Sequence, residues 1–141
     1  MSYFGAFAEL GLVRRPPPGE RKVLLMHGTT VPRAQSIIRQ GGMAPGRAFF
    51  AMGMSNRDLA RIFARRAGAR GPRAGDPALL LTTVPEADFE RMRRLGLARA
   101  VPFDAADRPE LRLRRQWIVE PGGIELLNRA AEDWRMVRMR R

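Results

Sequence analysis

The only histidine in the 141-residue chain, His27, stands at the end of an apolar run and is followed by Gly28 and Thr29. A short apolar run that closes in a glycine is typical of a buried strand ending in a turn, and residues 31–40 then have apolar side chains at helical spacing. Backbone N–H groups at a helix start can bind anions, and a glycine lets a ligand approach the backbone. This pattern favours a ligand cleft around His27, although a lone histidine also fits a purely structural role.

The composition favours a polyanionic partner and argues against metal chemistry. The chain carries 26 basic and 14 acidic residues, a net charge of +12, and Lys22 is its single lysine. Such a balance is typical of proteins that contact RNA or DNA, but an arginine- and alanine-rich composition also follows from a GC-rich genome. With no cysteine and no second histidine, zinc would have only carboxylates to bind it, so we expect no metal site and no disulfide.

The length predicts one domain, because 141 residues are too few for two ordinary ones. Residues 1–20 are interpreted as an N-terminal arm with a Pro-rich linker, and residues 21–141 as the domain itself. No stretch approaches the length of apolar chain needed to span a bilayer, and the N-terminus lacks the features of a signal peptide. A cytoplasmic location without membrane contact is therefore the default expectation, and the oligomeric state stays open.

Strands and helices alternate along the domain. The pattern predicts helices near 31–40, 55–67 and 86–95, the last with Phe89, Met92 and Leu95 inward, and strands at 23–30, 47–52, 78–84, 98–103 and 116–120. Residues 111–115 alternate like a strand, and residues 124–141 begin as a helical turn and end as either helix or basic edge strand. Ser55 and Asp58 have the spacing of a capping box. The arginines of the second helix are either a phosphate-facing surface or a solvated face.

Four features in this order resemble the ADP-ribosyltransferase fold, over most of residues 23–128. They are the strand ending His-Gly-Thr, the Ala-x-x-Ile-x-x-x-Gly helix at 34–41, the Phe-Phe-Ala strand at 49–51 and the Gln-Trp-Ile-Val strand at 116–119. The resemblance implies a single α+β domain with split antiparallel β-sheets, two small sheets that meet at a cleft, with flanking helices. It also implies NAD as co-substrate and a triad of histidine, tyrosine and glutamate on three strands.

The resemblance assigns roles residue by residue. His27 holds the nicotinamide-side ribose of NAD, the backbone of Gly28 contacts the carboxamide and Thr29 completes the motif. Phe49 takes the place of the stacking tyrosine, with Phe50 beside it, and a stacking ring needs no hydroxyl. Gln116 takes the place of the catalytic glutamate; its neutral amide keeps the hydrogen bonds but loses the charge that stabilises an oxocarbenium-like ribose. Glu120 is the alternative carboxylate on that strand.

The implied function is NAD-dependent ADP-ribosyl transfer to a macromolecular acceptor, of the toxin, phage or host-modifying type. Two alternatives stay open. The RNA 2′-phosphotransferases also carry a His-Gly-Thr strand and use arginines with histidine in place of the glutamate, but they have an additional N-terminal lobe that twenty residues cannot supply. The other alternative is a catalytically decayed module that binds NAD, ADP-ribose or nucleic acid. If the acceptor is a nucleic acid, the basic segments 68–76 and 135–141 are expected to contact it.

Overall fold

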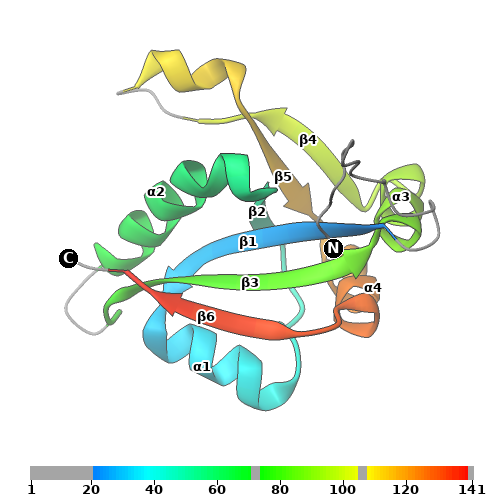
Figure 1. Cartoon of the computed structure of the whole chain (residues 1–141), viewed down its shortest axis with the longest axis horizontal. Coiled ribbons are helices and arrows are strands. Elements are labelled where there is room, and N and C mark those ends of the chain that lie inside the picture. Colours follow the sequence, from blue (N-terminus) through cyan, green and yellow to red (C-terminus); the bar gives the residue numbers. More distant parts are fainter. Residues whose placement is uncertain (1–20, 71–73, 105–107, 140–141) are drawn as a thin grey trace, which may run out of the picture.

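Two long strands form the centre of the sheet: β1 (Lys22–Thr30) pairs over its whole length with β3 (Pro77–Pro85). The structure, a computed structural model, describes residues 21–70, 74–104 and 108–139. In these ranges the chain forms one α+β domain, shown in Figure 1, and the predicted arm at 1–20 lies outside them. The other elements are β2 (Ala48–Met52), β4 (Ala98–Pro102), β5 (Arg115–Val119), β6 (Trp134–Arg138), α1 (Val31–Gln40), α2 (Arg57–Gly68), α3 (Glu86–Arg94), α4 (Pro121–Ala130), and the 3-10 turns η2 (Met54–Asn56) and η3 (Pro109–Leu113).

The six strands of the described residues form one antiparallel sheet in the order β4-β5-β2-β1-β3-β6. The prediction of two separate small sheets is therefore wrong, and β2 is the reason. The C-terminal end of β2, Ala51 and Met52, pairs with β1, whereas its N-terminal part, Ala48 to Phe50, pairs with β5. The strand thus belongs to both halves of the sheet, and the β4–β5 hairpin turns away from β1 and β3 (Figure 1).

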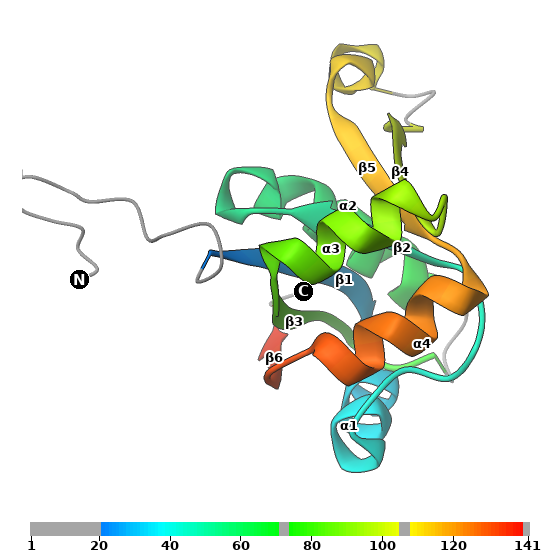
Figure 2. The same ribbon diagram turned by 90° about the vertical axis from the view of Figure 1, so that its right-hand side faces the viewer.

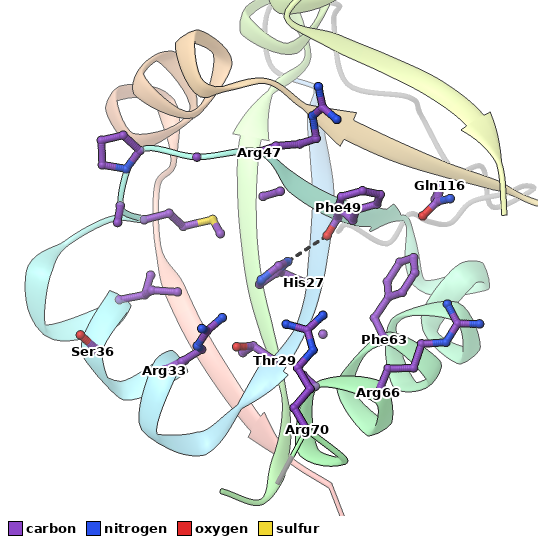
Figure 3. A pocket seen from close by; sticks show the side chains of 18 of the residues that line it. His27, Thr29, Arg33, Ser36, Arg47, Phe49, Phe63, Arg66, Arg70 and Gln116 are labelled. Carbon is purple, nitrogen blue, oxygen red and sulfur yellow. Dashed lines mark hydrogen bonds between the residues drawn. The ribbon is translucent and has the colours of Figure 1, made fainter. Parts of the chain in front are cut away.

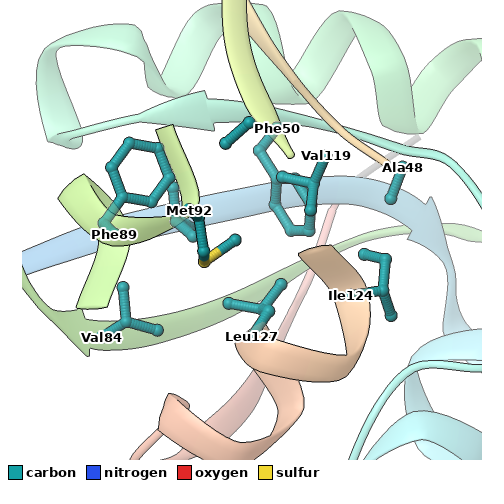
Figure 4. Packing of buried hydrophobic residues seen from close by; sticks show 10 residues of the cluster. Ala48, Phe50, Val84, Phe89, Met92, Val119, Ile124 and Leu127 are labelled. Carbon is teal, nitrogen blue, oxygen red and sulfur yellow. The ribbon is translucent and has the colours of Figure 1, made fainter. Parts of the chain in front are cut away.

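Successive side chains of β1 point to opposite faces of the sheet, and a hydrophobic core lies on each face. Leu25 packs with Phe50 and residues of α3 and α4, while Met26 packs with Ala51 and the buried face of α2. Figure 2 shows α3 and α4 side by side, and Figure 4 shows Phe89, Met92, Ile124 and Leu127 of these helices closing over Phe50. No helix in the described part of the chain is long and apolar enough to cross a membrane.

Gly28 is required by the packing of α2 against β1. A Cβ atom at this position would lie 2.5 Å from both the carbonyl oxygen of Ala60 and the Cβ of Phe63, and closer still to the backbone nitrogen of Ala64. Because two of these three atoms belong to the helix backbone, a rotamer change cannot relieve the overlap. The glycine that follows His27 therefore sets how closely α2 approaches the strand that carries the histidine.

We expect Gly28→Ala to destabilise the domain by about 3 kcal/mol, because α2 must move away from β1 to admit the methyl group. The melting temperature should fall by roughly 10 °C. Gly122→Ala in α4 is the matched control, since its added Cβ meets only Leu97 side-chain carbon at 3.4 Å; it should be neutral or slightly stabilising. Equal melting temperatures for the two variants would contradict this account.

Three local predictions differ from the structure. Ser55 was expected to cap α2, but it lies in η2. The N-cap position belongs to Asn56, the next residue. Residues 111–115 are not a continuous strand: η3 occupies Pro109–Leu113, with Leu113 92% exposed. Leu95 is 56% exposed just past the end of α3. The C-terminal segment resolves into α4 and β6, an edge strand of the sheet.

Candidate active site

A pocket of about 730 Å³ opens where β1 and β2 separate. Its walls come from the ends of β1, β2 and β5, from α1, from α2 and from the loop that precedes β2; Figure 3 shows the side chains that line it. The pocket brings together five of the seven predicted site residues, namely His27, Gly28, Thr29, Phe49 and Gln116. Phe50 and Glu120 do not line it.

His27 spans the gap between the diverging strands. After Met26 pairs with Ala51, the backbones separate, and Nδ1 of His27 donates a hydrogen bond to the backbone carbonyl of Phe49 at 2.8 Å. A carbonyl oxygen only accepts, so the proton of the neutral ring is on Nδ1, and Nε2 keeps a lone pair that can accept a hydrogen bond from a ligand hydroxyl. Burial lowers the pKa of His27 from its ordinary 6.5, since the imidazolium is poorly solvated; the Phe49 bond raises it and Arg33 lowers it further.

Because the folded-state pKa of His27 is lowered, the free energy of unfolding should fall as the pH drops below about 6.5. Below pH 6.5, His27 binds a proton more readily in the unfolded chain than in the folded chain, which favours unfolding. Above pH 6.5, His27 is neutral in both states, so it no longer makes the free energy of unfolding depend on pH. His27 is the only histidine, so its imidazole NMR signals can be followed without ambiguity and should titrate with a midpoint below 6.5. A midpoint at or above 6.5 would contradict the neutral, hydrogen-bond-accepting ring.

Phe49 and Phe50 point to opposite sides of β2, as alternation along a strand requires. Phe49 is 37% exposed, lines the pocket and meets the Phe63 ring of α2 edge-on, with ring centroids 6.5 Å apart. Phe50 is fully buried in the core, where its ring lies 5.4 Å from that of His27. Of these two rings, only Phe49 is exposed to the pocket and available for stacking. The Phe50 ring packs next to His27 from the side of the core.

Gln116 and Glu120 lie in different surroundings. Gln116 is 5% exposed; its Nε2 donates to the Pro102 carbonyl at 3.1 Å, while its Oε1 makes no hydrogen bond to the described residues. Figure 3 shows the oxygen on the pocket side of this carboxamide. Glu120 precedes α4 and forms ion pairs with Arg47 at 3.0 Å and Arg99 at 3.4 Å. It therefore touches the pocket only through Arg47.

Four arginines line this pocket, with Asp104 as the one acidic residue of the described lining: Arg33, Arg47, Arg66 and Arg70. The sequence placed Arg70 in a basic segment expected to contact a nucleic-acid acceptor and left Arg66 on a helix face that was either phosphate-facing or solvated. It did not indicate Arg33 or Arg47. Arg47 is paired with Glu120, and Arg66 donates to the Asp104 carbonyl and covers the Phe103 ring. The side chains of Arg33 and Arg70 form no hydrogen bond or ion pair with the described residues, and Figure 3 shows both reaching toward His27. The position of Arg33 in the first turn after His-Gly-Thr was the available signal.

The start of α1 is a weaker anion site than the sequence suggested. The Val31 N–H donates to the Asp76 carbonyl at 2.8 Å, and Pro32 has no N–H to offer. Only later N–H groups of the first turn remain, so the arginine side chains supply most of the positive potential in the pocket.

Two polar clusters hold the walls of the pocket. Asn128 of α4 accepts from the Met43 N–H and donates to the Met43 carbonyl, both at 2.8 Å, which fixes the loop before β2. Arg114, just before β5, binds both carboxylate oxygens of Asp58 and the side chain of Asn56. The Arg114 guanidinium lowers the pKa of the Asp58 carboxyl. The carboxylate that the sequence assigned to a capping box is thus used to tie the start of α2 to β5.

Comparison of the chain with protein-family models, with curated proteins and with solved structures finds no match. The resemblance to ADP-ribosyltransferases therefore stands on the residues alone. Among the described residues, no three histidine or carboxylate side chains gather in a way that could hold a metal ion.

Proposed function

We propose that the pocket binds NAD and that the chain transfers ADP-ribose from NAD to a macromolecular acceptor. The observation that carries this proposal is that His27, Phe49 and Gln116, distant in sequence, come from three neighbouring strands and line one pocket. By the resemblance, these three residues take the positions of the histidine, tyrosine and glutamate triad.

The dimensions and charges of the pocket support a dinucleotide ligand. Its volume of about 730 Å³ lies within the range of small-molecule sites. Phe49 offers a partly exposed ring for the nicotinamide, and Nε2 of His27 can accept a hydrogen bond from a ribose hydroxyl. Arg33 and Arg70, which have no partner among the described residues, suit a pyrophosphate because a guanidinium binds phosphate oxygens through two parallel hydrogen bonds.

The proposed reaction breaks the glycosidic bond between nicotinamide and ribose. The electron pair of that bond leaves with the nicotinamide, positive charge develops on the ribose, and an oxygen or nitrogen nucleophile of the acceptor forms the new bond. Oε1 of Gln116 can accept a hydrogen bond from the ribose, but its neutral amide supplies less stabilisation of the positive charge than a carboxylate would. The chain as it stands should therefore be a slow enzyme unless the acceptor provides the missing charge.

The test is titration calorimetry of the purified chain with NAD, together with chromatographic measurement of released nicotinamide. We expect saturable binding and nicotinamide release that the unfolded chain does not show. ADP-ribose should compete with NAD, because it carries the same pyrophosphate and ribose. Absence of NAD binding up to about 1 mM, the upper end of ordinary substrate constants, would overturn the proposal.

The arginines of the pocket favour a second candidate, transfer to a phosphate group as in the RNA 2′-phosphotransferases. A phosphomonoester is already an anionic nucleophile, so it needs no general base and brings negative charge next to the ribose cation. Gln116 in place of a glutamate, in a pocket that four arginines also line, suits such an acceptor. An RNA oligonucleotide with a 2′-phosphate should then stimulate nicotinamide release, and the same RNA after phosphatase treatment should not. Equal release with both RNAs would remove this candidate.

A further inference from the structure

A second recess, of about 480 Å³, lies on the other flank of α2. In Figure 1, α2 runs above β1, and β6 is the outermost strand beyond β3, with its C-terminal end close to the C-terminal end of α2. Side chains from α2, β1, β3 and the end of β6 line this recess, which we call the α2–β6 groove: Met26, Met54, Arg57, Arg61, Arg65, Leu79, Leu81, Val137, Arg138 and Met139.

Arginine side chains form both sides of the α2–β6 groove. Arg57, Arg61 and Arg65 are four residues apart, so they lie on one face of α2 with about 6 Å of helix rise between neighbours. Arg138 stands on the opposite side, at the end of β6. All four are exposed, and none of their side chains forms a hydrogen bond or an ion pair with another described residue. The described lining of the groove contains no acidic side chain to neutralise this positive charge.

The same helix presents different residues to the active-site pocket. Phe63 and Arg66 of α2, and Arg70 just past its end, line that pocket, while Arg57, Arg61 and Arg65 face the groove. The two recesses are therefore separate binding surfaces that share α2 as a wall. The floor of the groove is apolar, from the partly buried Leu81 and Met139 over the buried Met26 and Leu79, and its described lining contains no aromatic ring.

We propose that the α2–β6 groove binds the sugar–phosphate backbone of single-stranded nucleic acid without regard to base sequence. Regularly spaced, unpaired guanidinium groups match the regularly spaced charges of such a backbone and bind phosphate oxygens bidentately. The apolar floor accommodates sugar and base surfaces, and the absence of aromatic rings removes the usual platform for base stacking. A recess between one helix and one strand admits a single chain, whereas a double helix would contact only its rim. This inference stands on the groove itself and does not depend on NAD chemistry in the pocket.

Fluorescence anisotropy with labelled single strands tests the groove. Binding at about 50 mM salt should be similar for oligonucleotides of different sequence, and log K should fall with log salt with a slope near −2.8, about 0.7 for each of four phosphates. The triple variant Arg57→Ala/Arg61→Ala/Arg65→Ala should bind about 100-fold more weakly at that salt concentration and lose about 2 units of the slope. The corresponding triple lysine variant should restore most of the binding.

The matched control is Arg91→Ala/Arg94→Ala/Arg129→Ala. It removes the same charge from exposed arginines of α3 and α4 that also have no partner among the described residues. This control should bind nearly as well as the unchanged chain. If both triple variants lose binding equally, if polyglutamate of equal charge competes as well as the oligonucleotide, or if a duplex binds more tightly than a single strand, the proposal is overturned. Both variants should keep their affinity for NAD, which separates failure of the groove from failure of the pocket.

Discussion

Replacing His27 by alanine should weaken NAD binding by about 100-fold. The variant loses the Nε2 acceptor for the ribose hydroxyl, and it leaves the Phe49 carbonyl without its hydrogen bond of 2.8 Å. A ribose hydroxyl left without its acceptor in the pocket costs on the order of 3 kcal/mol, or two powers of ten in affinity. Titration calorimetry measures the change directly.

Two controls distinguish a loss of NAD binding from a loss of the fold. The thermal unfolding curve of His27→Ala should remain cooperative, because the side chain lies at the pocket rather than within either core cluster. Lys22→Ala changes the exposed start of the same strand and removes only a surface ion pair with Glu132. That variant should bind NAD normally. Unchanged NAD affinity in a folded His27→Ala protein would show that the pocket does not use the histidine and would refute the proposed function.

Replacing Gln116 by glutamate should raise the rate of nicotinamide release by about 100-fold if the reaction proceeds through a ribose cation. A carboxylate in this position stabilises the developing positive charge, and one electrostatic group of this kind is worth about 3 kcal/mol. The same change should destabilise the domain by about 1 to 3 kcal/mol, because the Nε2 bond to the Pro102 carbonyl is lost. Steady-state rates and urea unfolding separate the two effects.

Gln40→Glu provides the matched control for Gln116→Glu. Gln40 lines the same pocket from α1, so the substitution adds the same charge by the same chemical change at another wall. It should leave the rate nearly unchanged. A strong increase only in Gln116→Glu supports a transferase site that has lost its carboxylate, whereas a decrease supports phosphate as the acceptor, because a carboxylate would then repel it. Equal rates in all three proteins would mean that position 116 takes no part in the reaction.

Several elements could be predicted from the sequence because their signals are local. The apolar run before His27, the helix at 31–40 ending at Gly41, and the strand at 78–84 all agree with β1, α1 and β3. Their periodicity arises from burial against the sheet, so pattern and structure have the same cause. Local signals failed where a distant side chain intervened. Asp58 has the spacing of a capping residue, but Arg114, 56 residues away in sequence, binds its carboxylate.

The composition of the pocket needed tertiary information. Arg33, Arg47 and Arg70 belong to a helix, a loop and the end of another helix, and no spacing rule connects them. The arginines of α2 also line two different recesses. From the sequence alone, they could be recognised only as the basic residues of one helix. Gly28 shows a similar limit: the pattern indicated a turn or a ligand contact, whereas the structure shows that α2 packs against its backbone.

The shared strand β2 has a consequence for how the molecule holds together. Nine residue pairs join β1 to β3, but only two join β1 to β2, and these two are the sole ladder between the halves of the described sheet. Cooperativity between the halves therefore rests on side-chain contacts more than on backbone pairing: the packing around Phe50, the His27–Phe49 hydrogen bond and the Arg114 cluster. A join of this kind gives way at a lower free energy than the β1–β3 ladder. The pocket sits at this join, so its width depends on side-chain contacts between the halves more than on backbone pairing.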